Sequence, residues 1–450
     1  MSLGACRLKR RILVLLVGLW VSLGFSSCGG SSKPKDPPSG LPDRVLASQG
    51  VTATFSAGSL VILNGYNDTI PGVARLQAGN SPGLMVVSPT RNIAATFDAS
   101  SNNVYAVDTF RETGIGNVRI PGPTSSMAFP TAQPIGYAAI PTATVNGYSF
   151  LGAVDILNFV TSQLTTIAVT NAQTVIASSN GTQLLVFSND SDAITVLSPS
   201  SAVPPVDLSC LSGSVNPVCT MVPGFDRPVW ALVSGNTAYI LNCGAECGGV
   251  QASVQTLDLT TLAVGPPVSV NGATIGLLSG SQLFVAGNGT PTGPLCTSIP
   301  SAATTAATYC GTLDIVDLST MTDPYYNNPS AEIAITDGFH DRIDMTTNGQ
   351  VFVGSHHCTN VGNVGNPSGE VRGCLSIYRT ADNSVVIPPD NGNVDGLQGF
   401  TTRDAEYVAE GGNLRVYYTL TDTLLINDFL PLGTIDIVGY VGDVKAIDFF

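Results

Sequence analysis

The sequence predicts an all-β protein, and three observations support this. The chain has 48 Gly and 29 Pro among 450 residues, and only 11% of its residues are charged, while 44% are hydrophobic. Short apolar segments alternate with turns rich in Gly, Asn and Ser, which is typical of strands rather than helices. One unit of strands and turns then recurs along most of the chain, and this repeat decides the architecture.

The clearest copy of the unit is the segment 81–108, SPGLMVVSPTRNIAATFDASSNNVYAVD. It contains an apolar strand, a Ser-Pro turn, a second apolar strand, a polar turn and a third strand that ends at Asp108. Similar units follow about every 40 to 60 residues, which is the repeat length of propeller blades. Because a single blade cannot bury both faces of its sheet, neighbouring blades must pack around an axis.

Eight segments have the pattern of a third strand: 59–63, 104–108, 152–156, 193–197, 254–258, 313–317, 375–378 and 414–418. The first unit begins at Pro42 with a second strand, and the chain ends with a first strand within 443–450. Pairing of these two segments completes one blade and removes open sheet edges. We therefore predict a single β-propeller over 42–450 with eight four-stranded blades, closed by its N- and C-terminal segments. Seven blades are the alternative if the unit at 124–166 is irregular.

The unit resembles the repeat of the YVTN-type β-propeller family, in which a Ser-Pro turn follows the first strand, Asn precedes the third strand and Asp ends it. The resemblance is close in 81–108 and recognisable in 42–70. Looser copies extend it over most of 42–450. The resemblance implies a propeller architecture, and it implies neither a ligand nor a reaction.

The first 41 residues have the pattern of a targeting segment followed by a tether. Four basic residues within 7–11 precede the apolar stretch 12–25, whose length suits a signal peptide better than a membrane span. Small residues then precede Cys28, as in a bacterial lipobox. We predict a signal peptide over 1–27, lipidation of Cys28 and a flexible Gly/Ser/Pro tether over 28–41. An ordinary signal peptide with an incidental cysteine is the alternative.

These features predict an exported bacterial lipoprotein that is attached to a membrane through its lipid anchor only. Gly29 after the lipobox cysteine favours the outer membrane or cell surface. The chain has 18 basic and 32 acidic residues, and loss of the four basic residues before Cys28 leaves 14 against 32, a net charge of −18. Such an acidic chain argues against nucleic acid partners and against adsorption to anionic lipid. We expect a monomer.

Eight cysteines follow the signal region, and an even number in an exported protein predicts disulfides. Proximity in the sequence favours the pairs Cys210/Cys219, Cys243/Cys247, Cys296/Cys310 and Cys358/Cys374. We expect all four pairs on one face of the disc, with three between second and third strands and Cys210/Cys219 between a fourth strand and the next blade. Long loops on a rigid scaffold often carry function. Protection of these loops from proteases is the alternative.

Few residues have the pattern of a catalytic or metal site. Ser81 lies in a G-x-S-x-G motif, but that motif forms a nucleophile elbow only between a strand and a helix, and a strand follows here. His340 together with His356 or His357 is a weak candidate for a metal or acid–base pair. Loop histidines with ordinary hydrogen bonds are the alternative.

Asp395 is the third weak metal candidate, because 391–396 has the Asn/Asp/Gly rhythm of a calcium loop. Thr402 stands where an EF-hand needs Glu, and an ordinary Asn/Asp/Gly turn explains the segment better.

We expect a binding or scaffold module that takes a protein or glycan partner through the disulfide-bonded loops, without a cofactor. The alternative is an exported propeller enzyme, lactonase- or hydrolase-like or quinoprotein-like, with a metal or substrate at the axial channel. In that alternative His340, Asp341, Asp226 and Asp443 are the candidate site residues.

Overall fold

The structure is a computed structural model that describes residues 37–51, 58–72, 75–198, 210, 219–289, 310–328, 330–358, 373–389, 391–400, 402–427 and 430–448. A compact unit extends over Leu41–Phe450, and Met1–Gly40 form a separate unit. The predicted signal peptide and Cys28 lie outside the described residues. Within the described part of the chain, no helix is long and apolar enough to cross a membrane.

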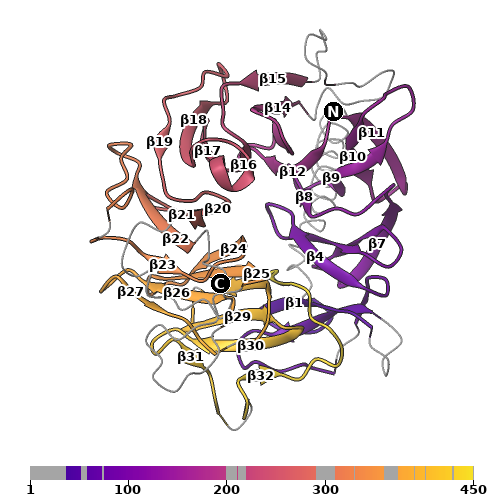
Figure 1. Cartoon of the computed structure of the whole chain (residues 1–450). Coiled ribbons are helices and arrows are strands. Elements are labelled where there is room, and N and C mark those ends of the chain that lie inside the picture. Colours follow the sequence, from indigo (N-terminus) through magenta and orange to yellow (C-terminus); the bar gives the residue numbers. More distant parts are fainter. Residues whose placement is uncertain are drawn as a thin grey trace, which may run out of the picture. The chain divides into compact units, whose positions relative to one another are not determined.

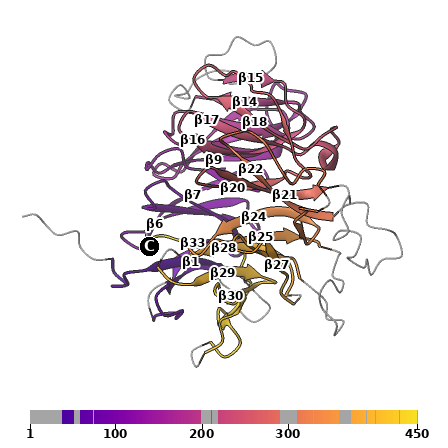
Figure 2. The ribbon, with the colours of Figure 1, turned by 90° about the vertical axis from the view of Figure 1, so that its left-hand side faces the viewer.

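The unit 41–450 is a ring of eight antiparallel sheets around one axis, as Figure 1 shows from one face of the disc and Figure 2 from its side. Blades 1 to 4 contain β33 (Val444–Ala446), β1 (Arg44–Gln49), β2 (Ser59–Asn64) and β3 (Leu76–Gln77); β4 (Pro82–Val87), β5 (Ile93–Asp98), β6 (Asn103–Asp108) and β7 (Thr113–Arg119); β8 (Ser126–Ala128), β9 (Ile135–Thr144), β10 (Leu151–Asn158) and β11 (Gln163–Ala168); and β12 (Ala172–Ala177), β13 (Leu184–Ser188), β14 (Ala193–Leu197) and β15 (Cys219–Pro223).

Blades 5 to 8 contain β16 (Pro228–Ser234), β17 (Thr237–Asn242), β18 (Ser253–Asp258) and β19 (Val268–Ser269); β20 (Ile275–Ser279), β21 (Gln282–Gly289), β22 (Cys310–Asp317) and β23 (Ala334–Ile335); β24 (Phe339–Met345), β25 (Gln350–His356), β26 (Leu375–Arg379) and β27 (Ser384–Val386); and β28 (Val394–Gly399), β29 (Ala405–Glu410) and β30 (Asn413–Tyr418), with β31 (Thr423–Leu424) and β32 (Thr434–Ile435) both paired to β30. A short 3-10 helix, Gly244–Cys247, follows β17.

The blade count and the ring closure predicted from the sequence are confirmed. The unit at 124–166 forms a regular blade from β8 to β11, so the propeller has eight blades rather than seven. β1 pairs antiparallel with β33, with Val45 opposite Ala446 and Ala47 opposite Val444. Each innermost strand contacts the innermost strand of the next blade, and β28 contacts β33, so the ring closes through the chain ends.

Hydrophobic side chains fill the space between blades. On β1, Val45 and Ala47 pack with Tyr407 of blade 8, while Leu46 packs with Met85 of blade 2. Successive residues of a strand point to opposite faces of its sheet, so a blade between two neighbours is apolar on both faces. This explains why the middle strands are continuous apolar segments in the sequence.

The two faces of the disc follow from the strand directions. Connections between second and third strands, and between successive blades, lie on one side, which we call the loop face. Connections between first and second strands, and between third and fourth strands, lie on the other side, which we call the turn face. β1 begins at the turn face, because it runs antiparallel to the first strand β33.

Three of the predicted cysteine pairs are bonded: Cys210–Cys219, Cys243–Cys247 and Cys358–Cys374. Disulfides indicate an exported protein. Cys296 lies outside the described residues, so the structure does not describe its predicted pairing with Cys310.

The prediction that all the pairs share one face is wrong for Cys210–Cys219. Cys219 begins β15, the fourth strand of blade 4, and pairs with Leu197 at the end of the third strand. The disulfide therefore joins a connection between third and fourth strands, which lies on the turn face. The fourth strand comes only after a long insertion, and the sequence pattern placed it before the insertion.

Candidate functional site on the loop face

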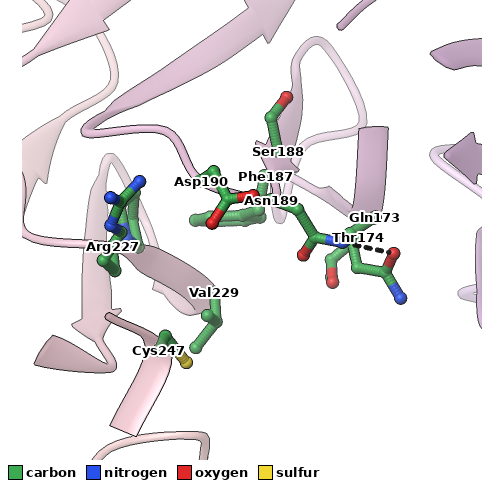
Figure 3. A pocket seen from close by; sticks show the side chains of 10 residues that line it. Gln173, Thr174, Phe187, Ser188, Asn189, Asp190, Arg227, Val229 and Cys247 are labelled. Atoms are coloured by element: carbon green, nitrogen blue, oxygen red, sulfur yellow. Dashed lines mark hydrogen bonds between the residues drawn. The ribbon is translucent and has the colours of Figure 1, made fainter. Parts of the chain in front are cut away.

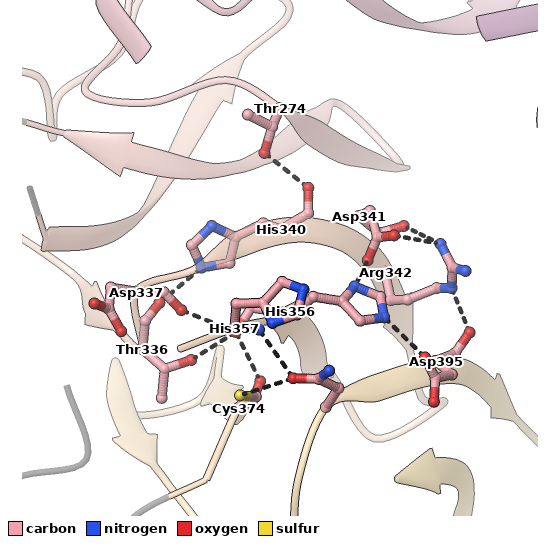
Figure 4. A network of polar contacts seen from close by, with 12 residues as sticks. Thr274, Thr336, Asp337, His340, Asp341, Arg342, His356, His357, Cys374 and Asp395 are labelled. Atoms are coloured by element: carbon pink, nitrogen blue, oxygen red, sulfur yellow. Dashed lines mark hydrogen bonds and ion pairs between the residues drawn. The ribbon is translucent and has the colours of Figure 1, made fainter. Parts of the chain in front are cut away.

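A polar network on the loop face joins blades 7 and 8 (Figure 4). The two ring nitrogens of His356 each meet a carboxylate: Nδ1 lies 3.0 Å from Asp341 Oδ1, and Nε2 lies 2.9 Å from Asp395 Oδ1. Arg342 Nη1 lies 3.0 Å from Asp341 Oδ2. The hydroxyl of Tyr440 donates to Asp395 Oδ2 at 2.6 Å, which ties the C-terminal segment to the same cluster.

Bulges in the first strands place these acids. The pairing of β24 with β25 shifts between His340 and Arg342, so Asp341 is the extra residue, and the pairing of β28 with β29 shifts at Asp395 in the same way. A bulge changes the direction of a side chain relative to the regular strand. The two bulges thus bring carboxylates from neighbouring blades to one histidine.

The network holds a charged imidazolium. Burial alone would lower the pKa of His356, but hydrogen bonds to Asp341 and Asp395 and the charges of these two carboxylates raise it to about 9. His356 is therefore protonated at neutral pH, and both of its nitrogens are engaged. Such a group acts as an ionic link between blades and lacks the free lone pair that a base or metal ligand needs.

The structure does not bring His340 together with His356 or His357. The His340 side chain is 1% exposed, and its Nε2 lies 2.7 Å from the Thr336 carbonyl oxygen. Burial lowers the pKa of His340. His357 contributes its backbone N–H, which donates to Asn393 Oδ1. Among the residues that the structure describes, no three His, Cys, Asp or Glu side chains are grouped to hold a metal ion.

The other candidates from the sequence also have local structural roles. Asp226 accepts hydrogen bonds from the backbone N–H groups of Val250 and Gln251. Asp443 accepts from the backbone N–H of Met85 and contacts Lys445 Nζ at 2.8 Å.

Asp395 and Ser81 do not lie in the local structures that their sequence motifs would require, a calcium loop and a nucleophile elbow. Asp395 lies in the strand β28 and contacts His356 and Tyr440, and the described residues 391–400 do not form a calcium loop. Ser81 directly precedes the strand β4, so the helix that a nucleophile elbow requires does not follow it.

A pocket of about 340 Å³ lies on the loop face between blades 4 and 5 (Figure 3). Its lining residues are Gln173, Thr174, Phe187, Ser188, Asn189, Asp190, Arg227, Pro228, Val229 and Cys247. Gln173 and Val229 occupy first-strand bulges of the same kind as Asp341 and Asp395. Cys247 places the Cys243–Cys247 disulfide in the pocket wall.

The polar groups of the pocket are only loosely paired with each other. Asn189 Nδ2 donates to Gln173 Oε1 at 3.2 Å. Arg227 Nε lies 3.8 Å from Asp192 Oδ1, a separation that leaves the guanidinium weakly held. Arg227 has a φ of 57°, a left-handed conformation that is rare for a long side chain. Sequence reasoning missed these residues, because no motif marks them; the nearby Cys243/Cys247 pair was the one signal of the region.

Comparisons with known proteins bear on the fold. No known family's sequence profile matches the chain, and no curated protein matches it. Hydrazine synthase of Kuenenia stuttgartiensis has a similar structure, with a TM-score of 0.51 and 13% identity over 76% of this chain and 96% of that one. The dihydro-heme d1 dehydrogenase NirN has a TM-score of 0.57 and 11% identity over 92% of this chain and 77% of that one. The chain is thus an eight-bladed β-propeller, and its likeness to these solved structures is a likeness of fold.

Proposed function

We propose that the protein is a lipid-anchored binding module of the cell envelope that holds a hydroxyl-rich ligand, the end of a glycan, in the pocket between blades 4 and 5. Lipidation at Cys28 would attach it to the outer membrane or cell surface. The observation that carries the proposal is the pocket itself, a cavity on the loop face that is lined by both polar and apolar side chains and whose wall includes a disulfide-bonded turn.

The chemistry of the lining suits hydroxyl groups. The amides of Gln173 and Asn189 each offer donors and an acceptor, Arg227 offers donors only and Asp190 offers acceptors only. A hydroxyl both donates and accepts, so a ligand with several hydroxyls can use all four side chains. The volume of about 340 Å³ lies in the range of small-molecule pockets and admits a single sugar unit.

The wall beside Cys247 is held from several sides. The disulfide closes the turn Gly244–Cys247. Glu246 in that turn accepts two hydrogen bonds from Asn288 of blade 6, one from the backbone N–H at 2.9 Å and one from the side-chain Nδ2 at 2.7 Å. A wall fixed before binding reduces the entropy lost when the ligand is ordered.

Binding of sugars to the purified mature chain tests the proposal. Isothermal titration with glucose, galactose, N-acetylglucosamine and short oligosaccharides of each should find at least one ligand. Gln173→Ala and Arg227→Ala should each weaken it by about three- to tenfold, the effect of one lost hydrogen bond.

His356→Gln is the matched control, since it changes a polar group on the same face outside the pocket, and it should leave the affinity unchanged. Failure of every sugar to bind, or equal losses in the control, would contradict the proposal. Turnover of a lactone or ester by the same protein would favour the enzyme alternative instead.

A further inference from the structure

The turns between third and fourth strands repeat one position on the turn face, and in four blades this position carries an exposed apolar side chain. The residues are Tyr66 in blade 1, Phe110 in blade 2, Val160 in blade 3 and Leu420 in blade 8, which are 75%, 43%, 68% and 53% exposed. Each is the second residue after the third strand of its blade. Because blades 8, 1, 2 and 3 are consecutive in the ring, the four side chains form an arc, which we call the apolar arc.

The remaining blades differ at this position. Blades 5, 6 and 7 carry Thr260, Ser319 and Ala381 there, all exposed. Blade 4 has the long insertion with Cys210 and Cys219 in place of the short turn. The apolar residues therefore do not follow from the turn structure, because the same turn forms with Thr or Ser.

The chain enters the propeller beside this arc. Asp43 precedes β1 at the turn face, and its carbonyl oxygen accepts a hydrogen bond of 2.7 Å from the backbone N–H of Gly65, the residue before Tyr66. Residues 28–41, the tether predicted from the sequence, therefore join the propeller at blade 1, within the apolar arc.

With the lipid anchor proposed at Cys28, the point at which the chain enters the propeller would favour the turn face as the one next to the membrane. A flexible chain of about 14 residues has a root-mean-square length of about 20 Å. A six-residue strand such as β1 spans about 20 Å, so its two ends, at the turn face and the loop face, are about that far apart. A tether of this length that leaves from the turn face would hold that face near the membrane. For the loop face to lie against the membrane, the tether would first have to extend along the whole depth of the disc.

We propose that the apolar arc docks on a lipid bilayer and inserts its four side chains at the interface. Tyr and other amphipathic or apolar side chains are stable at the boundary between headgroups and acyl chains. Since the chain is strongly acidic, the attraction is hydrophobic, and the expected surface is zwitterionic rather than anionic lipid. The loop face and its pocket then point away from the membrane. This proposal rests on the lipid anchor of the proposed function for the orientation of the disc, and it does not depend on the ligand of the pocket.

Flotation with phosphatidylcholine vesicles tests the docking in the mature chain made without its acyl group by Cys28→Ser. The chain should float with the vesicles, and the fraction bound should be insensitive to salt. The variant Tyr66→Ser, Phe110→Thr, Val160→Thr and Leu420→Ser, which copies the residue types of blades 5 and 6, should lose at least about tenfold in partitioning. Val250→Ser is the matched control, because Val250 is 85% exposed on the loop face, and it should bind like the parent.

A second measurement uses the lipidated protein in the same vesicles. Hydrogen exchange should slow in the turns at Tyr66, Phe110 and Val160 and stay unchanged at Val250. No vesicle binding by the Cys28→Ser chain, or equal losses in the arc variant and the control, would overturn the proposal. Concentration-dependent dimerisation that the arc variant abolishes, without vesicle binding, would assign the arc to a second copy of the chain instead.

Discussion

The two faces of this propeller share one scaffold and differ in how they use it. On the turn face, a similar turn follows the third strand in every blade except blade 4, which has the long insertion, and these turns differ in single exposed side chains such as Phe110 and Thr260. On the loop face, the connections differ in length, and disulfides, an ionic network and a pocket lie among them. A face built from hairpin turns is fixed by the strands that it joins, whereas the longer connections are free to differ.

Within the loop face, one position takes different roles in different blades. The bulge in the first strand holds Gln173 in blade 4, Val229 in blade 5, Asp341 in blade 7 and Asp395 in blade 8. In blades 4 and 5 these residues line a pocket, and in blades 7 and 8 they form an ionic link. The comparison indicates that the backbone sets where a side chain is presented and that the residue type decides whether the site is open or closed.

The largest expected effect tests whether the ring closure is held at the turn face. Arg44 is 4% exposed and lies 2.7 Å from Asp448 and 3.0 Å from Glu112, so it links both chain ends to blade 2. Arg44→Ala removes the buried cation that contacts both carboxylates and should lower the free energy of unfolding by about 3 to 5 kcal/mol in urea titrations. Arg111→Ala, which removes an exposed pair, should cost less than about 0.5 kcal/mol. Similar losses in both variants would contradict this role of Arg44.

The stability that each disulfide contributes should increase with the number of residues in the loop that it closes. Replacing Cys358 and Cys374 by Ala, a separation of 16 residues, should cost about 3 kcal/mol, and replacing Cys243 and Cys247, a separation of 4 residues, about 2 kcal/mol. Urea unfolding of the two double variants measures both values. The reverse order would show that the Cys243–Cys247 disulfide also stabilises the folded turn around Gly244, beyond its effect on the entropy of the unfolded chain.

The ionic network makes the loop face sensitive to alkaline pH. The pKa of His356 is about 9 in the folded protein, against about 6.5 in an unfolded chain, so its stabilising effect is complete below about pH 6.5 and is lost as the pH rises through 9. The difference in unfolding free energy between the parent and His356→Gln should shrink by about 2 kcal/mol over this range, after allowance for partial solvent exposure. Parallel stability curves for the two proteins would argue against the link.

The smallest effect on stability comes from adding apolar side chains to the turn face on the half of the ring opposite the apolar arc. Thr260→Leu with Ser319→Leu places apolar residues at the same turn position in blades 5 and 6. Each change at an exposed site should alter stability by less than about 0.5 kcal/mol. Flotation with phosphatidylcholine vesicles should increase, because the added side chains lie on the face that docks, and an unchanged or lower bound fraction would argue that the turn face does not lie against the bilayer.

Much of the fold was predictable because local patterns carry it. All eight third strands and the pairing of the chain ends follow from runs such as Val104–Asp108, where β-branched and apolar residues end at a turn. The prediction failed at Cys210–Cys219, because an insertion separates β14 from β15 and proximity in the sequence does not show on which face an insertion lies. It also missed Gln173 and Arg227, which come to line one pocket only when blades 4 and 5 pack.

The sequence by itself determined the repeat, the number of blades, the ring closure and the local pairing of the three described disulfides, because these depend on interactions between residues close in the chain or on the completion of one blade. Only the tertiary structure decided which side chains meet. His356 with Asp341 and Asp395, the pocket beside Cys247 and the apolar arc all join residues from different blades. Their contacts depend on how the sheets pack around the axis and on the bulges that redirect single side chains, and neither leaves a pattern in the order of residues.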